Sequence, residues 1–202
     1  MKNILINNGA LGRQGKTTIA YTIWQQVPGY KYITNDIENA QATVDIETKI
    51  PESQRLDVSD GGDFGVEADD KCIFDFGGKP DDRLLAIAKH VDLIIIPMTF
   101  LSTSELALTM RNINTYKTVN KNILLVLNNV EQKKLLELYR AITANTQAFD
   151  FQVLELSRSD FMHRLPNEGK TIYDVAAENK MAAGQLKKKL IPQFNKILEA
   201  VV

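Results

Sequence analysis

The stretch Ala10-Leu-Gly-Arg-Gln-Gly-Lys-Thr-Thr18 decides the fold of this chain. It follows an apolar segment, Asn3–Asn7, with the composition of a buried β-strand, and it leads into a segment with a helical pattern, Lys16–Gln26. The motif [Ala/Gly]-x-x-x-x-Gly-Lys-[Ser/Thr] requires this order of strand, glycine-containing turn and helix. The sequence therefore predicts a phosphate-binding loop. The alternative is a Gly-Lys-Thr turn that starts a helix by chance.

In such a loop, backbone N–H groups and the helix N-terminus point at the phosphate oxygens of a nucleoside triphosphate. Lys16 would neutralise charge on the β- and γ-phosphates, and the hydroxyl of Thr17 would ligate Mg²⁺. The residues expected to contact the nucleotide here are Leu11, Gly12, Arg13, Gln14, Gly15, Lys16, Thr17 and Thr18.

The composition is that of a soluble globular protein: 44% of the 202 residues are hydrophobic, 24% are charged and the net charge is −1. This balance does not indicate a strongly basic nucleic-acid binder. The single cysteine, Cys72, excludes an intrachain disulfide and fits a reducing compartment. The first residues lack the pattern of a signal peptide, and the longest apolar run, Leu93–Met98, is too short to span a bilayer. We therefore expect a cytoplasmic protein.

Short apolar runs alternate with helical patterns, which is typical of parallel β-α-β units. Several runs are apolar throughout, as strands are when helices cover both faces of a sheet. We predict one domain over residues 1–202, a doubly wound α/β P-loop NTPase fold with a mainly parallel twisted sheet and helices on both faces. The expected strands are Asn3–Asn7, Tyr30–Thr34, Lys71–Phe74, Leu93–Pro97, Ile123–Asn128 and Phe151–Leu156. The expected helices are Lys16–Gln26, Asp81–His90, Ser104–Tyr116 and Glu131–Asn145, and Ser104 is the expected N-cap of the third.

Two segments are less regular. Glu38–Asp70 is polar and rich in turn residues, so we expect a loop with one short strand or helix. Ala182–Val202 carries apolar residues on one helical face, and Pro192 predicts a kink in that helix.

Acidic residues follow two of the predicted strands. Asp75 ends an apolar strand and is followed by Gly77 and Gly78, so we expect it to hold Mg²⁺ through a water while the glycine backbone approaches the γ-phosphate. Asp36 or Glu38 follows the second strand and would orient the attacking water. The alternatives are an ordinary strand end with a glycine turn, and a solvated turn.

Together these elements resemble the ParA/MinD superfamily of deviant-Walker P-loop ATPases over nearly the whole chain. The resemblance assigns Ala10–Thr18 to the Walker A motif, the region near Asp36 to switch I and the Asp75 segment to switch II. Further similar segments are Leu93–Pro97, Leu125–Asn129 and Asp160–Val175. The Asn7-Asn-Gly opening and the modest length look closest to plasmid-encoded StbB-like and ParA-like partition or stability proteins.

The resemblance implies an ATPase that binds ATP with Mg²⁺ and forms a nucleotide-dependent homodimer. We expect hydrolysis to be slow without a partner, because phosphoryl transfer depends on positioned charge that Leu11 does not supply. Lys16, Asp36 and Asp75 would be its catalytic residues, and Asn128 or Asn129 would read adenine. The guanine-reading Asn-Lys-x-Asp pattern is absent there, which favours ATP. Implied partners are an adaptor or centromere-binding protein and non-specific DNA, and the implied task is plasmid partition, DNA segregation or related cargo positioning.

One part of the loop departs from the superfamily pattern Lys-Gly-Gly-x-Gly-Lys-Thr. The first lysine, which reaches across the dimer to the partner's nucleotide, is replaced by Leu11, and the second glycine is replaced by Arg13. Leucine carries no charge for phosphate, whereas the guanidinium of Arg13 can bind phosphate in cis or in trans. The alternative leaves Arg13 in solvent.

Two other functions fit the same motifs. A small-molecule kinase or ligase would build its acceptor pocket from Glu38–Asp70, and an adaptor would hold ATP without turnover. The basic run Lys187–Lys189 would contact DNA or form a solvated helix face. The last five residues lack the basic character of a membrane-binding tail, so a membrane partner is not expected.

Overall fold

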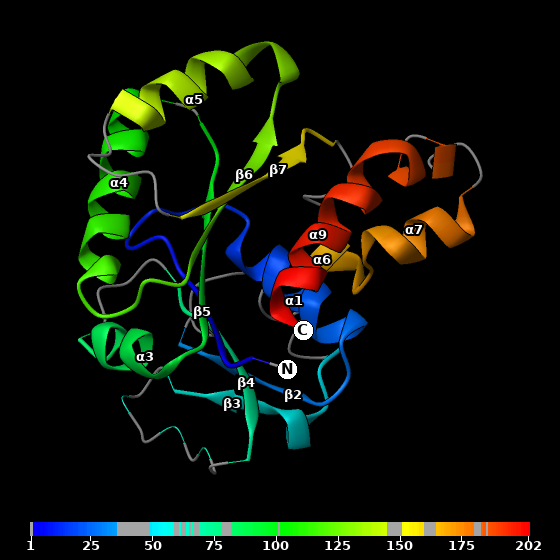
Figure 1. The fold of residues 1–202 in the computed structure, drawn as a ribbon. Helices are drawn as coiled ribbons and strands as arrows, with labels where there is room; N and C mark the ends of the chain where they lie inside the picture. The colour runs from blue at the N-terminus through cyan, green and yellow to red at the C-terminus, as the bar shows by residue number, and fades with distance from the viewer. Residues whose placement is uncertain are drawn as a thin grey trace.

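Seven parallel strands form one sheet in the computed structural model of the protein, in the order β3-β2-β4-β1-β5-β6-β7 (Figure 1). The structure describes residues 2–35, 49–58, 61, 64, 66, 69–77, 82–100, 102–144, 151–159, 165–179, 183–184 and 186–202. The strands are β1 (Ile4–Ile6), β2 (Tyr30–Thr34), β3 (Arg55–Asp57), β4 (Lys71–Asp75), β5 (Leu93–Met98), β6 (Ile123–Val130) and β7 (Gln152–Ser157). The predicted parallel α/β fold is confirmed.

Helices cover both faces of this sheet. Figure 1 shows α1, α6, α7 and α9 on one side and α3, α4 and α5 on the other. The first group is α1 (Lys16–Gln26), α6 (Leu165–Glu168), α7 (Ile172–Glu178) and α9 (Ile191–Val201), and the second is α3 (Leu84–His90), α4 (Thr103–Lys117) and α5 (Leu135–Ala144). Shorter turns are η2 (Glu52–Gln54), η3 (Gln132–Lys134) and the π-helical η4 (Leu186–Leu190). No helix of the described ranges combines the length and apolar character that a membrane span needs.

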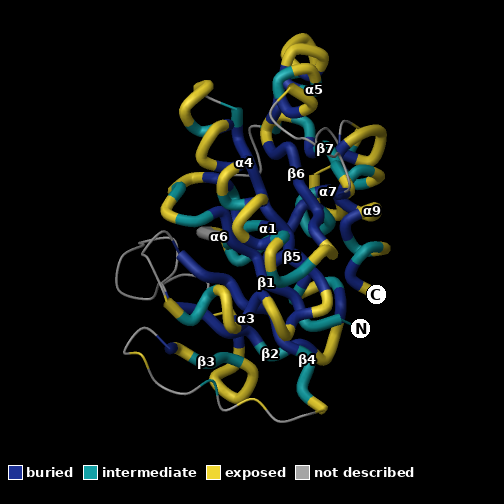
Figure 2. Tube along the Cα trace, turned by 60° about the vertical axis from the view of Figure 1, so that its left-hand side comes forward, coloured by how far each residue is buried: buried dark blue, intermediate teal, exposed yellow. Residues whose placement is uncertain are grey.

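Each face of the sheet has its own apolar core, because successive strand residues point to opposite sides. Ile4 and Ile6 belong to the core that contains α1 and α9, whereas Leu5 belongs to the core that contains α3, α4 and α5. All three β1 residues are fully buried, and Figure 2 shows the same for the central strands. Burial on both faces explains why these strands read as unbroken apolar runs.

The sequence patterns missed the position of β3. This strand has only three residues, Arg55–Asp57, and pairs with β2 at the edge of the sheet. It lies inside the segment where one short strand or helix was expected, and η2 precedes it directly. A strand at the edge needs few apolar residues because one side of it faces solvent. Residues 36–48, which include Asp36 and Glu38, lie outside the described part of the chain.

The start of α4 corrects one prediction. Ser102, and not Ser104, is the N-cap: its backbone is extended and its hydroxyl accepts a hydrogen bond from the Glu105 N–H at 3.2 Å. The helix therefore begins at Thr103. Ser102 and Glu105 have the Ser-x-x-Glu spacing typical of a helix start, and this spacing identifies the cap better than the nearest serine does.

The C-terminal helix changes from π-helical to α-helical geometry next to Pro192, the residue at which the sequence predicts a kink. The chain makes the π-helical turn η4 over Leu186–Leu190 and continues directly into α9, in which Pro192 occupies the first turn. Proline has no N–H to donate, but the N–H groups in the first turn of an α-helix have no partner within the helix. The α-helix can therefore begin at this position without losing a hydrogen bond. Phe194 and Ile197 are fully buried against the sheet, which fixes this helix over β7.

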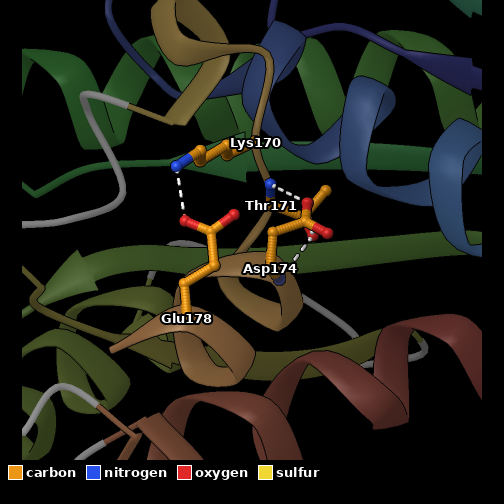
Figure 3. Close-up of polar contacts among 4 residues, drawn as sticks. All are labelled: Lys170, Thr171, Asp174 and Glu178. Atoms are coloured by element: carbon orange, nitrogen blue, oxygen red, sulfur yellow. Dashed lines mark hydrogen bonds and ion pairs between the residues drawn. The ribbon is translucent and has the colours of Figure 1, made fainter. Parts of the chain in front are cut away.

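A second Gly-Lys-Thr tripeptide, at Gly169, begins α7 instead of a phosphate loop (Figure 3). Thr171 and Asp174 form a reciprocal capping box: the Asp174 carboxylate accepts from the Thr171 N–H at 2.7 Å, and the Thr171 hydroxyl accepts from the Asp174 N–H at 3.4 Å. The ammonium of Lys170 forms an exposed ion pair with Glu178, the last residue of α7. The tripeptide here stabilises a helix start.

We expect Thr171→Ala to destabilise the protein by about 1 kcal/mol, because it removes the cap from a buried helix start. For a chain of this length, that loss lowers the unfolding temperature by about 2–4 °C. Lys170→Ala is the matched control and should change the temperature less, since an exposed ion pair contributes little. Thermal unfolding followed by circular dichroism measures both, and equal shifts for the two variants would contradict the capping role.

Candidate functional site

The phosphate-loop motif lies where two neighbouring strands send their connections to opposite faces of the sheet. β1 leads into α1 on one face, and its neighbour β4 leads towards α3 on the other. Ligands of open α/β sheets bind in the crevice that such a divergence creates at the carboxyl ends of the strands. The register pairs Asp75 with Ile6 on one side and with Thr34 on the other. Asp75 therefore lies beside the start of the loop.

The loop reaches α1 through Gly15, whose φ of +84° is in the left-handed region. A side chain there would be strained, and a Cβ atom would also collide with the amide nitrogen of Asn128. Arg13 has a φ of +58° as well, although it is not a glycine, and it is exposed. Left-handed residues of this kind occur in the backbone concavities that bind anions, so the conformation of the loop is compatible with a phosphate site.

Gln14 ties the loop to two other elements. Its side chain is 1% exposed, and its Oε1 accepts hydrogen bonds from the N–H and the hydroxyl of Thr99 at 2.7 and 3.1 Å. Its Nε2 donates to the Gly12 carbonyl at 3.0 Å, and its own carbonyl accepts from the Asn128 amide at 2.9 Å. Thr99 follows β5 and Asn128 belongs to β6, so the loop is held against both strand ends.

Asn7 and Asn8 attach the other end of the loop to α4. The Asn7 Nδ2 donates to the Phe76 carbonyl at 3.0 Å, and its Oδ1 accepts from the Tyr116 hydroxyl at 2.7 Å. The Asn8 Nδ2 donates to the Pro97 carbonyl at 2.9 Å. Both asparagines are fully buried, and α4 contributes two further contacts to Asn8, from the side chains of Thr109 and Asn112.

Lys16 is 7% exposed at the first position of α1, and its ammonium donates to the carbonyl of Leu11 at 2.7 Å. This bond closes the loop across its opening. Thr17 and Thr18 are half-buried in the same helical turn. Lys16 thus lies at the loop that the sequence predicts for phosphate, with its charged end directed back over the loop.

Asp75 is 4% exposed at the end of β4, where the hydroxyl of Tyr32 donates to its Oδ2 at 2.6 Å. Burial, with a further contribution from the charge of Asp75, raises the pKa of Tyr32 well above its usual value. Tyr32 is therefore a hydroxyl donor at any physiological pH. By strand alternation, Asp75 shares the side of Ile73, which belongs to the core that also contains α1.

The backbone after Asp75 contacts the end of β2. The N–H of Gly77 donates to the Oδ1 of Asn35 at 2.7 Å, and both residues are buried. Gly77 is the residue predicted to approach the γ-phosphate. Gly78 and the predicted water-positioning residues Asp36 and Glu38 lie outside the described residues.

Asn128 and Asn129 lie side by side in sequence but in different environments. Asn128 is 8% exposed, and its amide donates to the loop at Gln14. Asn129 is exposed, has a φ of +57° and lies at a register shift in the pairing of β6 with β7. Of the two predicted base-reading residues, Asn128 is thus part of the loop's support, and Asn129 presents its side chain to solvent.

Four of the residues that shape this site were not predicted from the sequence. Paired asparagines directly after a strand are unusual in an apolar context, so Asn7 and Asn8 did carry a signal. Tyr32 reads as a core aromatic of a strand and Asn35 as a turn residue. Gln14 was predicted to contact the nucleotide, but its hydrogen bond with Thr99 was not predicted. Their roles depend on side-chain contacts with strands that are distant in sequence.

The oxygen donors at this site fit Mg²⁺. Thr17 offers a hydroxyl in the first turn of α1, and Asp75 offers a carboxylate at the end of β4. Mg²⁺ is usually bound through one or two carboxylates together with substrate phosphates. Among the described residues, no group of three or more His, Cys, Asp or Glu side chains could hold a metal ion. Mg²⁺ held by these two side chains would complete its coordination with nucleotide phosphates and water.

The fold and the loop define the class of protein: the sheet order, with β1 at its centre and a Gly-Lys-Thr loop leading into α1, is a P-loop NTPase fold. No protein-family model matches the chain, and no curated protein matches its sequence. Solved structures do match it. The apo McdA structure from Cyanthece has a TM-score of 0.65 and 14% identity, with 99% of each chain covered.

Two further structures are equally distant in sequence. A ParA family ATPase from Chlorobium tepidum TLS has a TM-score of 0.59 and 15% identity over 96% of this chain and 99% of its own. A putative plasmid partition protein from Borrelia burgdorferi B31, bound to AMPPNP, has a TM-score of 0.56 and 15% identity over 85% of this chain and 91% of its own. Within the P-loop class, the chain therefore has the ParA/MinD-like fold that its motifs resemble.

We expect Gly15→Ala to destabilise the protein and to weaken nucleotide binding, because the new methyl group meets both an unfavourable φ and the Asn128 amide. The backbone strain alone costs about 1–2 kcal/mol. Gly12→Ala is the matched control in the same loop, since nothing lies within 4 Å of a Cβ atom there. Thermal unfolding and titration with a fluorescent ATP analogue measure both effects. If the two variants behave alike, the assigned loop geometry is wrong.

Proposed function

We propose that this protein is a ParA-like ATPase, in which ATP with Mg²⁺ controls a homodimer that partitions plasmid DNA or positions related cargo. One observation carries the proposal: Lys16 and Thr17 begin the helix that follows β1, and Asp75 ends the neighbouring strand β4, so the separately predicted groups lie at the carboxyl ends of adjacent strands. The shared fold with a plasmid partition protein bound to AMPPNP supports it. The proposal takes residues 1–202 as one ATPase domain and places it in the cytoplasm.

In this proposal, the backbone of Leu11–Gly15 and the N-terminus of α1 bind the phosphates. Lys16 exchanges its bond with the Leu11 carbonyl for the β- and γ-phosphate oxygens, which is favourable because a charged acceptor makes a stronger hydrogen bond. Thr17 and Asp75 hold Mg²⁺, which would supply positive charge to the triphosphate. The Gly77 N–H leaves Asn35 to reach the γ-phosphate. Asp36 or Glu38 would orient the attacking water.

Base recognition falls to Asn129 in the proposed complex. The Asn128 amide is engaged by the Gln14 carbonyl, whereas Asn129 is exposed at the end of β6. Both lie near the end of β6, and the sequence resembles a superfamily in which the terminal residue of this strand reads adenine. Asn128 then acts on the nucleotide indirectly, through the loop that it supports.

Dimerisation is proposed to bring Arg13 towards the second nucleotide. Arg13 is exposed, and Gly12 beside it is also exposed. A guanidinium at this position can replace the missing signature lysine, because it binds phosphate with two parallel hydrogen bonds. Hydrolysis by such a site would be slow until a partner, such as a centromere-binding protein or adaptor, completes it.

Wild-type protein should bind ATP at micromolar concentrations with Mg²⁺ and move towards a dimer on a sizing column. We expect Lys16→Ala to bind ATP about 10- to 100-fold more weakly, because a charge-assisted hydrogen bond is lost. Lys121→Ala is the control, since Lys121 is exposed before β6 and far from the loop in the fold. Absence of ATP binding by the wild type would refute the proposed function. Phosphate transfer to a metabolite instead of water would favour a kinase.

A basic surface at the carboxyl ends of the strands, on the same side of the sheet as the phosphate loop, is a candidate for DNA contact. Lys187, Lys188 and Lys189 are exposed on η4, and the Lys189 ammonium donates to Gln132 of η3 at 3.1 Å. This contact places the η4 lysines beside those of η3. The further exposed cations there are Lys133, Lys134 and Arg158, of which Lys133 and Arg158 pair with Glu131. The patch thus combines segments separated by more than fifty residues.

We expect Lys187→Glu with Lys188→Glu to weaken retention of duplex DNA. If each lysine contacts one phosphate, the slope of log K against log salt falls by about 2. Lys89→Glu with Lys121→Glu makes the same change in net charge at the opposite edge of the sheet and is the matched control. Salt-dependent binding to a labelled duplex, with ATP and Mg²⁺ present, measures both double variants. Equal loss in the two would assign the effect to net charge and exclude a local patch.

A further inference from the structure

The hydrogen bond between Tyr32 and Asp75 joins two buried side chains, one of which is the carboxylate proposed to hold Mg²⁺. Tyr32 is 2% exposed and Asp75 is 4% exposed, and the hydroxyl-to-Oδ2 distance is 2.6 Å. In the register of β2 with β4, Tyr32 lies opposite Ile73, and Thr34 lies opposite Asp75. Tyr32 and Asp75 are therefore on the same face of the sheet, and the tyrosine side chain extends two residues along the strands to meet the carboxylate. A buried hydroxyl donor to a carboxylate is a short, strong contact with little freedom.

This contact limits how Asp75 can turn. A carboxylate has two oxygens that exchange places by rotation of the side chain, and a metal site needs one of them held in a fixed direction. Because Tyr32 comes from the middle of a buried strand and packs in the core with α1, its hydroxyl cannot follow such a rotation. The neighbouring bond from the Gly77 N–H to Asn35 holds the next part of the chain to the residue that directly follows β2.

We propose that Tyr32 is a positioning residue for Mg²⁺: it fixes the Oδ2 of Asp75 so that the carboxylate is already oriented when ATP and Mg²⁺ arrive. This inference rests on the proposed nucleotide function. It gives a residue of β2 a role in the metal site, although Tyr32 belongs to neither the phosphate-loop motif nor the switch segments. Residues that orient a ligating carboxylate typically contribute 10–100-fold to metal affinity, although they never touch the metal.

The chain provides a matched control on the same strand. Tyr30 lies two residues earlier on the same face of β2, is 1% exposed, and donates its hydroxyl to the Lys2 carbonyl at 2.8 Å. Its hydroxyl contacts the carbonyls of Lys2 and Val201, which lie near the two ends of the described chain and at the amino ends of the strands, away from Asp75. Tyr30→Phe and Tyr32→Phe therefore each remove one buried, hydrogen-bonded hydroxyl, but only the second removes it from Asp75.

In the experiment, Mg²⁺ is titrated into each protein in the presence of a fluorescent ATP analogue. The affinity for the analogue at each Mg²⁺ concentration is compared with the affinity in EDTA, and the midpoint is the Mg²⁺ concentration that gives half of the gain. Tyr32→Phe should bind the analogue like the wild type in EDTA, because the phosphate loop is unchanged. Its midpoint in Mg²⁺ should rise about tenfold. Tyr30→Phe should keep the wild-type midpoint, and the unfolding temperatures of both variants show how much each hydroxyl contributes to folding.

A double variant tests whether Tyr32 acts through the carboxylate. If it does, adding Tyr32→Phe to Asp75→Asn should leave the Mg²⁺ midpoint of the single Asp75→Asn protein unchanged. A normal midpoint for Tyr32→Phe, or equal shifts for the two tyrosine variants, overturns the inference while the proposed function stands. A wild type that binds no ATP analogue in either condition overturns the proposed function, and the inference with it.

Discussion

Buried amide side chains hold the loop between β1 and α1 in its shape, and the arrangement of the site depends on them. Asn7, Asn8, Gln14 and Asn128 each expose less than a tenth of their surface. An amide buried without partners would cost several kcal/mol, so each of them requires the elements that satisfy it. Their bonds reach the residue after β4, the end of β5, the strand β6 and the helix α4. The loop can therefore take this form only when the surrounding sheet is correctly assembled.

The sequence predicted the parts of the fold that depend on continuous burial. Six of the seven strands read as apolar runs, because helices cover both of their faces. The edge strand β3 escaped because three residues beside solvent need no apolar pattern. The cap of α4 was placed two residues late, because several hydroxyl residues stand together there and only Ser102 has its oxygen directed at a helix N–H.

The candidate site was predictable at the positions where the conformation or the chemistry of the loop allows only one type of residue. Glycine at position 15 and lysine at position 16 are required by the loop, so the motif identified them. The contributions of Tyr32, Asn35 and Gln14 come from neighbours in space, and strand order cannot be read from residue types alone. The two Gly-Lys-Thr tripeptides make the same point: Lys16 lies in the loop after β1, whereas Lys170 pairs with a glutamate on α7.

The ends of the described chain meet on the edge of the sheet away from the loop. The Lys2 N–H donates to the Val201 carbonyl at 3.2 Å, and Tyr30 binds both carbonyls of that pair of residues. Adjacent ends make a domain suitable for insertion into another chain or for circular permutation. Any polypeptide joined at either end would emerge on the side opposite the phosphate edge. Sequence could therefore be added there in evolution or in engineering without crowding the face on which nucleotides and DNA are proposed to bind.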